Sequence, residues 1–60
     1  MHILITDRKT AKNFTVGPIF LIGANYTPTK GEYFEEAWKI ACDDGLVDPN
    51  NRANYSFAFA

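Results

Sequence analysis

The segment of residues 29–45 constrains the fold most, because it predicts a helix with both ends defined. Thr29 and Glu32 have the spacing of a capping box, in which each side chain accepts a hydrogen bond from a free backbone N–H group. At the other end, Gly45 suits the left-handed conformation that terminates helices, and Leu46 can fold back on the last turn. The apolar positions between them follow helical spacing: Tyr33, Phe34, Ala37, Trp38, Ile40 and Ala41. This amphipathic helix requires an apolar surface to pack against.

Two strands are predicted before the helix. Residues 2–6 are rich in β-branched side chains and short, which is typical of a strand. The polar residues 7–12 predict a hairpin loop, and strand character resumes at residues 13–16. Gly17-Pro18 interrupts this second strand, because proline has no N–H to donate to a ladder. We expect residues 19–22 to continue the strand after this break.

A third strand is predicted after the helix. Residues 48–51 form a turn with proline at its second position, and residues 54–60 then alternate large rings with small side chains. The rings belong to Tyr55, Phe57 and Phe59. We expect them to pack against Phe34 and Trp38. The chain is therefore expected to be a single small domain spanning 1–60, with an α+β fold in β-β-α-β order. Its small antiparallel sheet would have three to four strands, with one helix packed on one face.

The apolar residues 19–22 conflict with a sheet that is polar on its outer face. If Phe20 and Ile22 face the helix, Ile19 and Leu21 face outward. An uncovered apolar strand invites association, so a loop, a partner protein or a second copy is expected to cover it. The residues of this expected self-association surface, which would make a homodimer, are Ile19, Leu21, Ser56 and Ala58.

The sequence offers little for catalysis or cofactor binding. One cysteine, Cys42, and one histidine, His2, cannot build a four-ligand zinc site. Reactive cysteines lie beside cationic groups, whereas the two residues that follow Cys42 are the acidic Asp43 and Asp44, so Cys42 is not expected to act as a nucleophile. No phosphate-binding, dinucleotide-binding or calcium-binding pattern is complete. We expect no enzyme activity, no cofactor and no metal.

Charge is divided between the two halves of the chain, although the formal net charge is only −1. Residues 1–30 carry a net +3 and residues 31–60 a net −4. Asp43 and Asp44 lie where the helix dipole disfavours anions. Either they help to end the helix, or their carboxylates meet a basic partner. The expected partner-binding residues are Glu32, Glu35, Glu36, Lys39, Asp43 and Asp44.

A basic loop gives an alternative. Arg8, Lys9 and Lys12 cluster in the expected hairpin loop and could contact nucleic acid, with strand aromatics stacking on bases. The acidic helix and the negative net charge count against this hypothesis, since nucleic-acid-binding domains are usually strongly basic.

No secretory signal is recognisable, because the start of the sequence has no basic region leading into an apolar core. No spanning segment is expected either, because the longest apolar run, residues 16–24, is short and contains Gly17-Pro18. We expect a cytoplasmic location. The function that fits best is that of a small non-catalytic regulator, inhibitor or adaptor that binds a larger protein, including the inhibitors encoded by mobile genetic elements. The alternative is a small nucleic-acid-binding module that uses residues 8–12.

Overall fold

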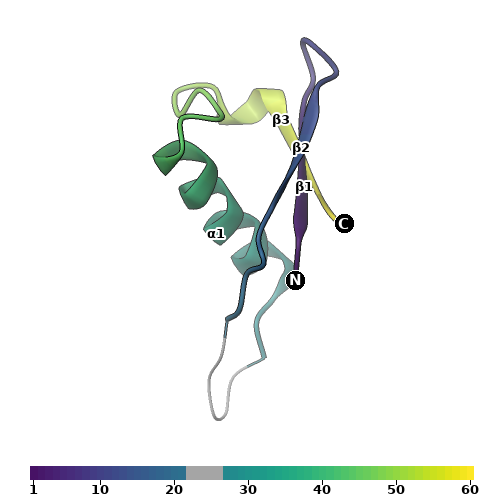
Figure 1. The fold of residues 1–60 in the computed structure, drawn as a ribbon, viewed down its shortest axis with the longest axis vertical. Coiled ribbons are helices and arrows are strands. Elements are labelled where there is room, and N and C mark those ends of the chain that lie inside the picture. Colours follow the sequence, from purple (N-terminus) through teal and green to yellow (C-terminus); the bar gives the residue numbers. More distant parts are fainter. Residues whose placement is uncertain (22–26) are drawn as a thin grey trace.

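A computed structural model describes residues 1–21 and 27–60 of the chain, and it has an α+β fold. Its elements are β1 (Ile3–Asp7), β2 (Asn13–Val16), α1 (Lys30–Asp43), a 3-10 turn (Arg52–Asn54) and β3 (Tyr55–Phe59). The strands form one antiparallel sheet in the order β2-β1-β3, and α1 lies beside this sheet (Figure 1). The expected β-β-α-β order and the sheet with one helix are therefore confirmed, with three strands in the described residues.

The hairpin between β1 and β2 forms as predicted. Its register pairs Thr6 with Asn13, and the N–H of Asp7 donates to the carbonyl of Lys12 at 2.8 Å. The Asp7 carboxylate also accepts the backbone N–H of Lys9 at 2.8 Å and the side-chain amide of Asn54 at 2.8 Å. The hydrogen bond from Asn54, followed by those from the loop, lowers the pKa of Asp7, because such bonds favour the charged carboxylate. Asp7 thus ties the loop to the residue that precedes β3.

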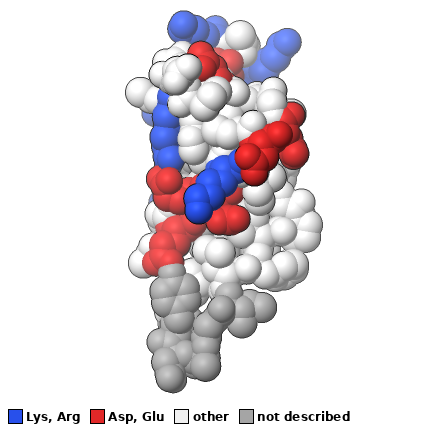
Figure 2. Space-filling model, turned by 90° about the vertical axis from the view of Figure 1, so that its left-hand side faces the viewer, with Lys and Arg blue, Asp and Glu red and all other residues white. Residues whose placement is uncertain are grey.

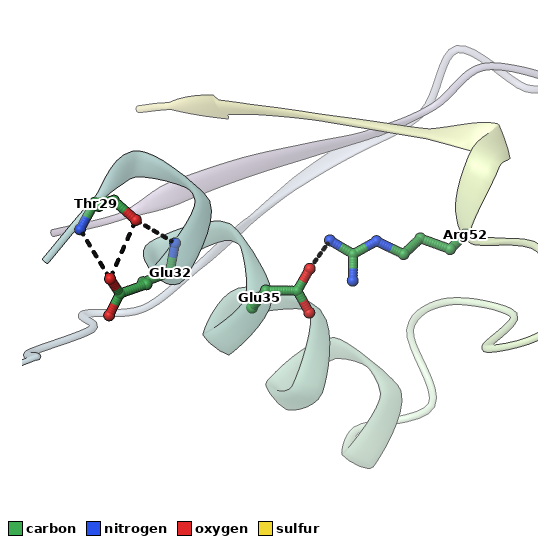
Figure 3. Close-up of polar contacts among 4 residues, drawn as sticks. All are labelled: Thr29, Glu32, Glu35 and Arg52. Carbon is green, nitrogen blue, oxygen red and sulfur yellow. Dashed lines mark hydrogen bonds and ion pairs between the residues drawn. The ribbon is translucent and has the colours of Figure 1, made fainter.

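The predicted capping box begins α1. The hydroxyl of Thr29 accepts the N–H of Glu32 at 3.3 Å, and the carboxylate of Glu32 accepts the N–H of Thr29 at 3.5 Å (Figure 3). Two N–H groups that have no partner within the helix are satisfied in this way. The first turn of α1 is therefore fixed by two residues that lie three positions apart in the sequence.

The expected glycine signal ends α1. Gly45 has φ 70°, and its N–H donates to the carbonyl of Cys42 at 3.1 Å. The N–H of Leu46 donates to the carbonyl of Ala41 at 2.9 Å. These two bonds define a Schellman motif. The backbone of Leu46 folds back as expected, but its side chain is 51% exposed, and the next residue, Val47, enters the core instead.

The core lies between α1 and the sheet. Ile3 and Ile5 of β1 and Ala37 and Ala41 of α1 are fully buried. The two alanines have short side chains, which allow the helix to approach the central strand closely. The buried core consists of Ile3, Ile5, Val16, Ile19, Ala37, Ala41 and Val47.

An aromatic layer joins α1 to β3, as predicted. Tyr55, Phe57 and Phe59 lie on the helix side of β3, in register with Asp7, Ile5 and Ile3. The ring of Phe34 stacks on Phe57 with 5.6 Å between centroids and lies 5.4 Å from Phe59. The ring of Trp38 lies 5.4 Å from that of Tyr55. Such aromatic pairs contribute about 0.5–1.5 kcal/mol each beyond their buried area.

The predicted strand at residues 19–22 is wrong for its described part. Residues 17–21 lie outside any strand, and their orientation is opposite to the expected one. Ile19 is 3% exposed and belongs to the core, Leu21 packs partly against that core, and Phe20 is 72% exposed. The N–H of Ile19 donates to the carbonyl of Met1 at 2.7 Å, which holds the segment against the start of β1. Ile22 lies outside the described residues.

The outer face of the sheet is mostly polar or small, as a two-layer fold requires. Its side chains come from the strand positions that alternate with the core: Leu4, Thr6, Asn13, Thr15, Ser56 and Ala58. Ile19 and Leu21 are not on this face. The exposed apolar strip that was expected to join them to Ser56 and Ala58 therefore does not form.

Candidate protein-binding surface

The outward side of α1 carries the expected acidic residues. Glu35, Lys39, Asp43 and Asp44 are exposed, whereas Glu32 and Glu36 are half-buried. Figure 2 shows acidic side chains gathered over the helix with basic ones among them. The arrangement follows from the helical period, because the apolar stripe faces the sheet and leaves the charged positions on the opposite side.

Arg52 modifies this surface, and sequence reasoning missed its role. Its guanidinium forms an ion pair with Glu35 at 2.6 Å (Figure 3). The guanidinium carbon also lies 5.3 Å from the ring centroid of Trp38 and 5.2 Å from that of Phe57. Arg52 thus covers the end of the aromatic layer and neutralises part of the charge of Glu35. Because both partners are partly exposed, the ion pair stabilises the fold by no more than about 1 kcal/mol.

A shallow groove of about 440 Å³ runs beside the first half of α1. Leu21 gives it an apolar wall, and three glutamates of α1 line its helical side. The residues that line it are Leu21, Thr29, Gly31, Glu32, Glu35, Glu36 and Lys39. Glu32 is engaged by Thr29 and Glu35 by Arg52, which leaves the Glu36 carboxylate as the one to which a lysine or arginine side chain lying against Leu21 could direct its charged end.

The end of α1 is consistent with both explanations of its aspartates. Asp43 is the last helical residue, and Asp44 is the C-cap, whose N–H donates to the carbonyl of Ile40 at 3.0 Å. The last turn contains no basic residue, and in residues 1–21 and 27–60 no ion pair reaches Asp43 or Asp44. These aspartates contribute to helix termination and still present free negative charge.

The basic residues of the alternative hypothesis lie in the loop between β1 and β2. Arg8, Lys9 and Lys12 are all exposed there. In Figure 1 this hairpin forms one end of the molecule, and Figure 2 shows basic side chains at the same end. The rings of β3, however, face α1 and pack against helix rings. Phe59 is exposed, but Tyr55 and Phe57 are half-buried, so the strand does not present a row of free rings on which bases could stack.

The residues considered for chemistry are separated. Cys42 is a free, half-buried thiol on α1, and His2 is exposed at the start of the chain. In the described part of the chain, no three side chains of His, Cys, Asp or Glu gather where they could hold a metal ion. Within the same residues, no helix is long and apolar enough to cross a bilayer.

Comparison with known proteins yields no relative from which a function could be transferred. No protein-family model matches the chain, and no curated protein or solved structure matches it.

Proposed function

We propose that this protein is a small, non-catalytic regulator of the cytoplasm that binds a larger protein through the outward face of α1. The observation that carries the proposal is the concentration of four acidic residues around Lys39 on one side of a helix capped at both ends, with a fifth, Asp44, at its C-cap. The partner would present a basic surface. Inhibitors and adaptors, including those encoded by mobile genetic elements, commonly work at this size.

Rigidity of the helix supports this proposal. The capping box fixes the start of α1, the Gly45 motif fixes its end, and aromatic rings anchor its inner side. A helix whose backbone is already fixed loses little backbone entropy on binding, so more of the interaction energy appears as affinity. The groove beside Leu21 adds an apolar contact to a surface that is otherwise charged.

Charge reversal on α1 tests the proposal. The immobilised protein is incubated with extract of the organism that encodes it, and bound proteins are identified by mass spectrometry. We expect the double variant Glu36→Lys/Asp43→Lys to capture the partner at least about tenfold less, because like charges then face each other across the interface. The matched control, Lys9→Glu/Lys12→Glu, reverses two charges in the hairpin loop and should retain capture.

Two results would overturn this proposal. One is equal capture of the same protein by the wild type and the helix variant, with both shown to be folded by circular dichroism. The other is loss of capture only in the hairpin control, which would move the binding surface to the loop.

Nucleic-acid binding through the hairpin is the second candidate, favoured by the exposure of all three basic side chains at one end of the molecule. It predicts binding to DNA or RNA that weakens as salt rises and is reduced in Lys9→Glu/Lys12→Glu. If no nucleic acid is retarded in a gel at low salt, this candidate is excluded.

A further inference from the structure

We propose that β3 is the interface of a homodimer, in which the free edge of one β3 pairs antiparallel with the β3 of a second copy, centred on Phe57. The inference is independent of the proposed function, because it uses the edge of the sheet and not the outward face of α1. It replaces the expected surface around Ile19 and Leu21, which are turned toward the core.

The first step is the direction of the backbone groups of β3. The N–H of Arg8 donates to the carbonyl of Asn54 at 3.0 Å, and the N–H of Ala60 donates to the carbonyl of His2 at 3.0 Å. In an antiparallel pair, alternate residues direct their N–H and C=O groups to the same neighbouring strand. The even-numbered residues of β3 therefore bond to β1, and Phe57 directs its backbone groups to the other side.

The odd-numbered residues thus form a free edge. In residues 1–21 and 27–60, β3 pairs with β1 alone, on one side. The N–H of Tyr55 is already bonded to the carbonyl of Arg52. The groups left at this edge are the N–H groups of Phe57 and Phe59 and the carbonyls of Tyr55, Phe57 and Phe59.

This set of groups is self-complementary in one register. When Phe57 lies opposite Phe57 of the second copy, the two residues exchange both N–H···O=C bonds. Phe59 then lies opposite Tyr55 of the second copy, so its free N–H meets the free carbonyl of Tyr55. Each free N–H group finds a free carbonyl, and the N–H of Tyr55, which is already used, is not required. This match is the reason for choosing a second copy over an unrelated strand.

The side chains fit the same register. On the helix side of the sheet, Phe59, which is 43% exposed, would lie beside Tyr55 of the second copy as an aromatic cross-strand pair. On the outer side, Ser56 would lie opposite Ala58 of the second copy, and both are small and uncharged. No like charges meet across the twofold axis.

The two edges of the sheet differ in their protection against pairing. Neither β2 nor β3 contains a charged residue, Gly or Pro, so the two strands differ in the residues at their ends. β2 follows Lys12 directly and is followed at once by Gly17-Pro18, whereas β3 lies between Asn54 and Ala60. Charges and proline are the usual devices that keep an edge strand from pairing. β3 lacks both devices, as expected of an edge strand that pairs with another strand.

The dimer would place both helices on the same side of one continuous sheet, because antiparallel pairing at an edge preserves the faces of the sheet. Both charged helix faces would then point away from the shared sheet in the same general direction. Such a dimer could engage a repetitive or twofold partner with an effective concentration that a monomer lacks.

Backbone methylation tests the edge directly, since a chain of 60 residues is accessible to chemical synthesis. N-methylation of Phe57 removes an outward N–H and leaves the ladder to β1 intact. The control is N-methylation of Thr15, whose N–H points to the free edge of β2 by the same alternation, since Asp7 bonds to Lys12. By sedimentation equilibrium we expect a dimer at micromolar concentration for the wild type and the control, and a monomer for methylated Phe57.

A pair of charge variants tests the register and needs no synthesis. In Ser56→Glu/Ala58→Glu, like charges face each other twice across the axis, and we expect the dimer dissociation constant to rise at least about tenfold. In Ser56→Glu/Ala58→Lys the same positions form two opposite-charge pairs, so the dimer should be retained. Near-ultraviolet circular dichroism of Trp38 verifies that each variant is folded.

The proposal is overturned if the folded wild type sediments as a monomer at these concentrations. It is also overturned if methylation of Phe57 leaves the dimer unchanged, or if the two charge variants dissociate equally.

Discussion

At the scale of single residues, Gly17 shows how a backbone position can be tied to one residue type. Its φ is 140°, in a region that side chains rarely allow. A Cβ atom placed there would lie 2.9 Å from the carbonyl oxygen of Met1 and 3.2 Å from the Cα of His2. The chain can pass this close to its own first residues only because Gly17 has no side chain.

Replacing Gly17 by alanine should therefore destabilise the protein by about 1–3 kcal/mol, the usual cost of a strained backbone conformation. Urea unfolding followed by the fluorescence of Trp38 gives the free energy of unfolding. The matched control is Gly31→Ala, where the nearest atom to an added Cβ is 4.0 Å away and the backbone is helical. Gly31→Ala should stabilise by about 0.5–1 kcal/mol. Equal effects of the two substitutions would contradict this interpretation.

At the scale of elements, the structure differs most clearly from the sequence-based expectation in the segment that follows β2. Alternation along a continued strand would place Phe20 toward α1 and Ile19 outward. The structure places Ile19 in the core at 3% exposure and leaves Phe20 at 72% exposure. The two arrangements therefore make opposite predictions for substitutions at neighbouring positions.

Ile19→Ala should destabilise the protein by about 2–5 kcal/mol, because it removes buried methyl and methylene groups and leaves a cavity. Phe20→Ala should change the free energy of unfolding by no more than about 0.5 kcal/mol, since the ring is largely in solvent. Thermal and urea unfolding of the two variants measure both values. The reverse order would restore the expected strand at residues 19–22 and refute the orientation described above.

Local signals explain why some elements were predictable. The start of α1 depends on Thr29 and Glu32, which are three positions apart, and its end depends on Gly45. Both ends of the helix could therefore be predicted from residues close to one another in the sequence. The aromatic layer followed from two periodicities, that of a helix and that of a strand. Capping residues and periodicities can be read from a short stretch of sequence, because they do not depend on contacts between distant residues.

Other features depend on contacts between distant parts of the chain. The orientation of Ile19 follows from its hydrogen bond to Met1, which no alternation pattern contains. The ion pair between Arg52 and Glu35 joins residues on different elements, and the candidate surface gains a cation that its own helix does not supply. The free groups of β3 depend on the register with β1, which follows from packing and not from composition.

At the scale of the whole molecule, stability depends on one layer of side chains between α1 and the sheet. A chain of this length buries only about 60% of the surface that it exposes when unfolded, so little stability is in reserve. β3 supplies rings to this layer and pairs with the central strand β1 along its whole length. We therefore expect the helix and the sheet to unfold together, without a stable part that lacks β3.

Deletion of residues 57–60 should abolish the cooperative thermal transition, because it removes the rings of Phe57 and Phe59. Phe34 then loses its ring partners on β3, and Trp38 keeps its contact with Tyr55 but loses the one with Phe57. Far-ultraviolet circular dichroism and Trp38 fluorescence report the loss. Deletion of Ala60 alone is the control, since it removes one hydrogen bond to His2 and no ring. A native-like transition in the longer deletion would contradict the expectation. Repeating the measurement on N-methyl-Phe57 separates the two roles of β3, because that chain keeps its rings while losing only the proposed contact with a second copy.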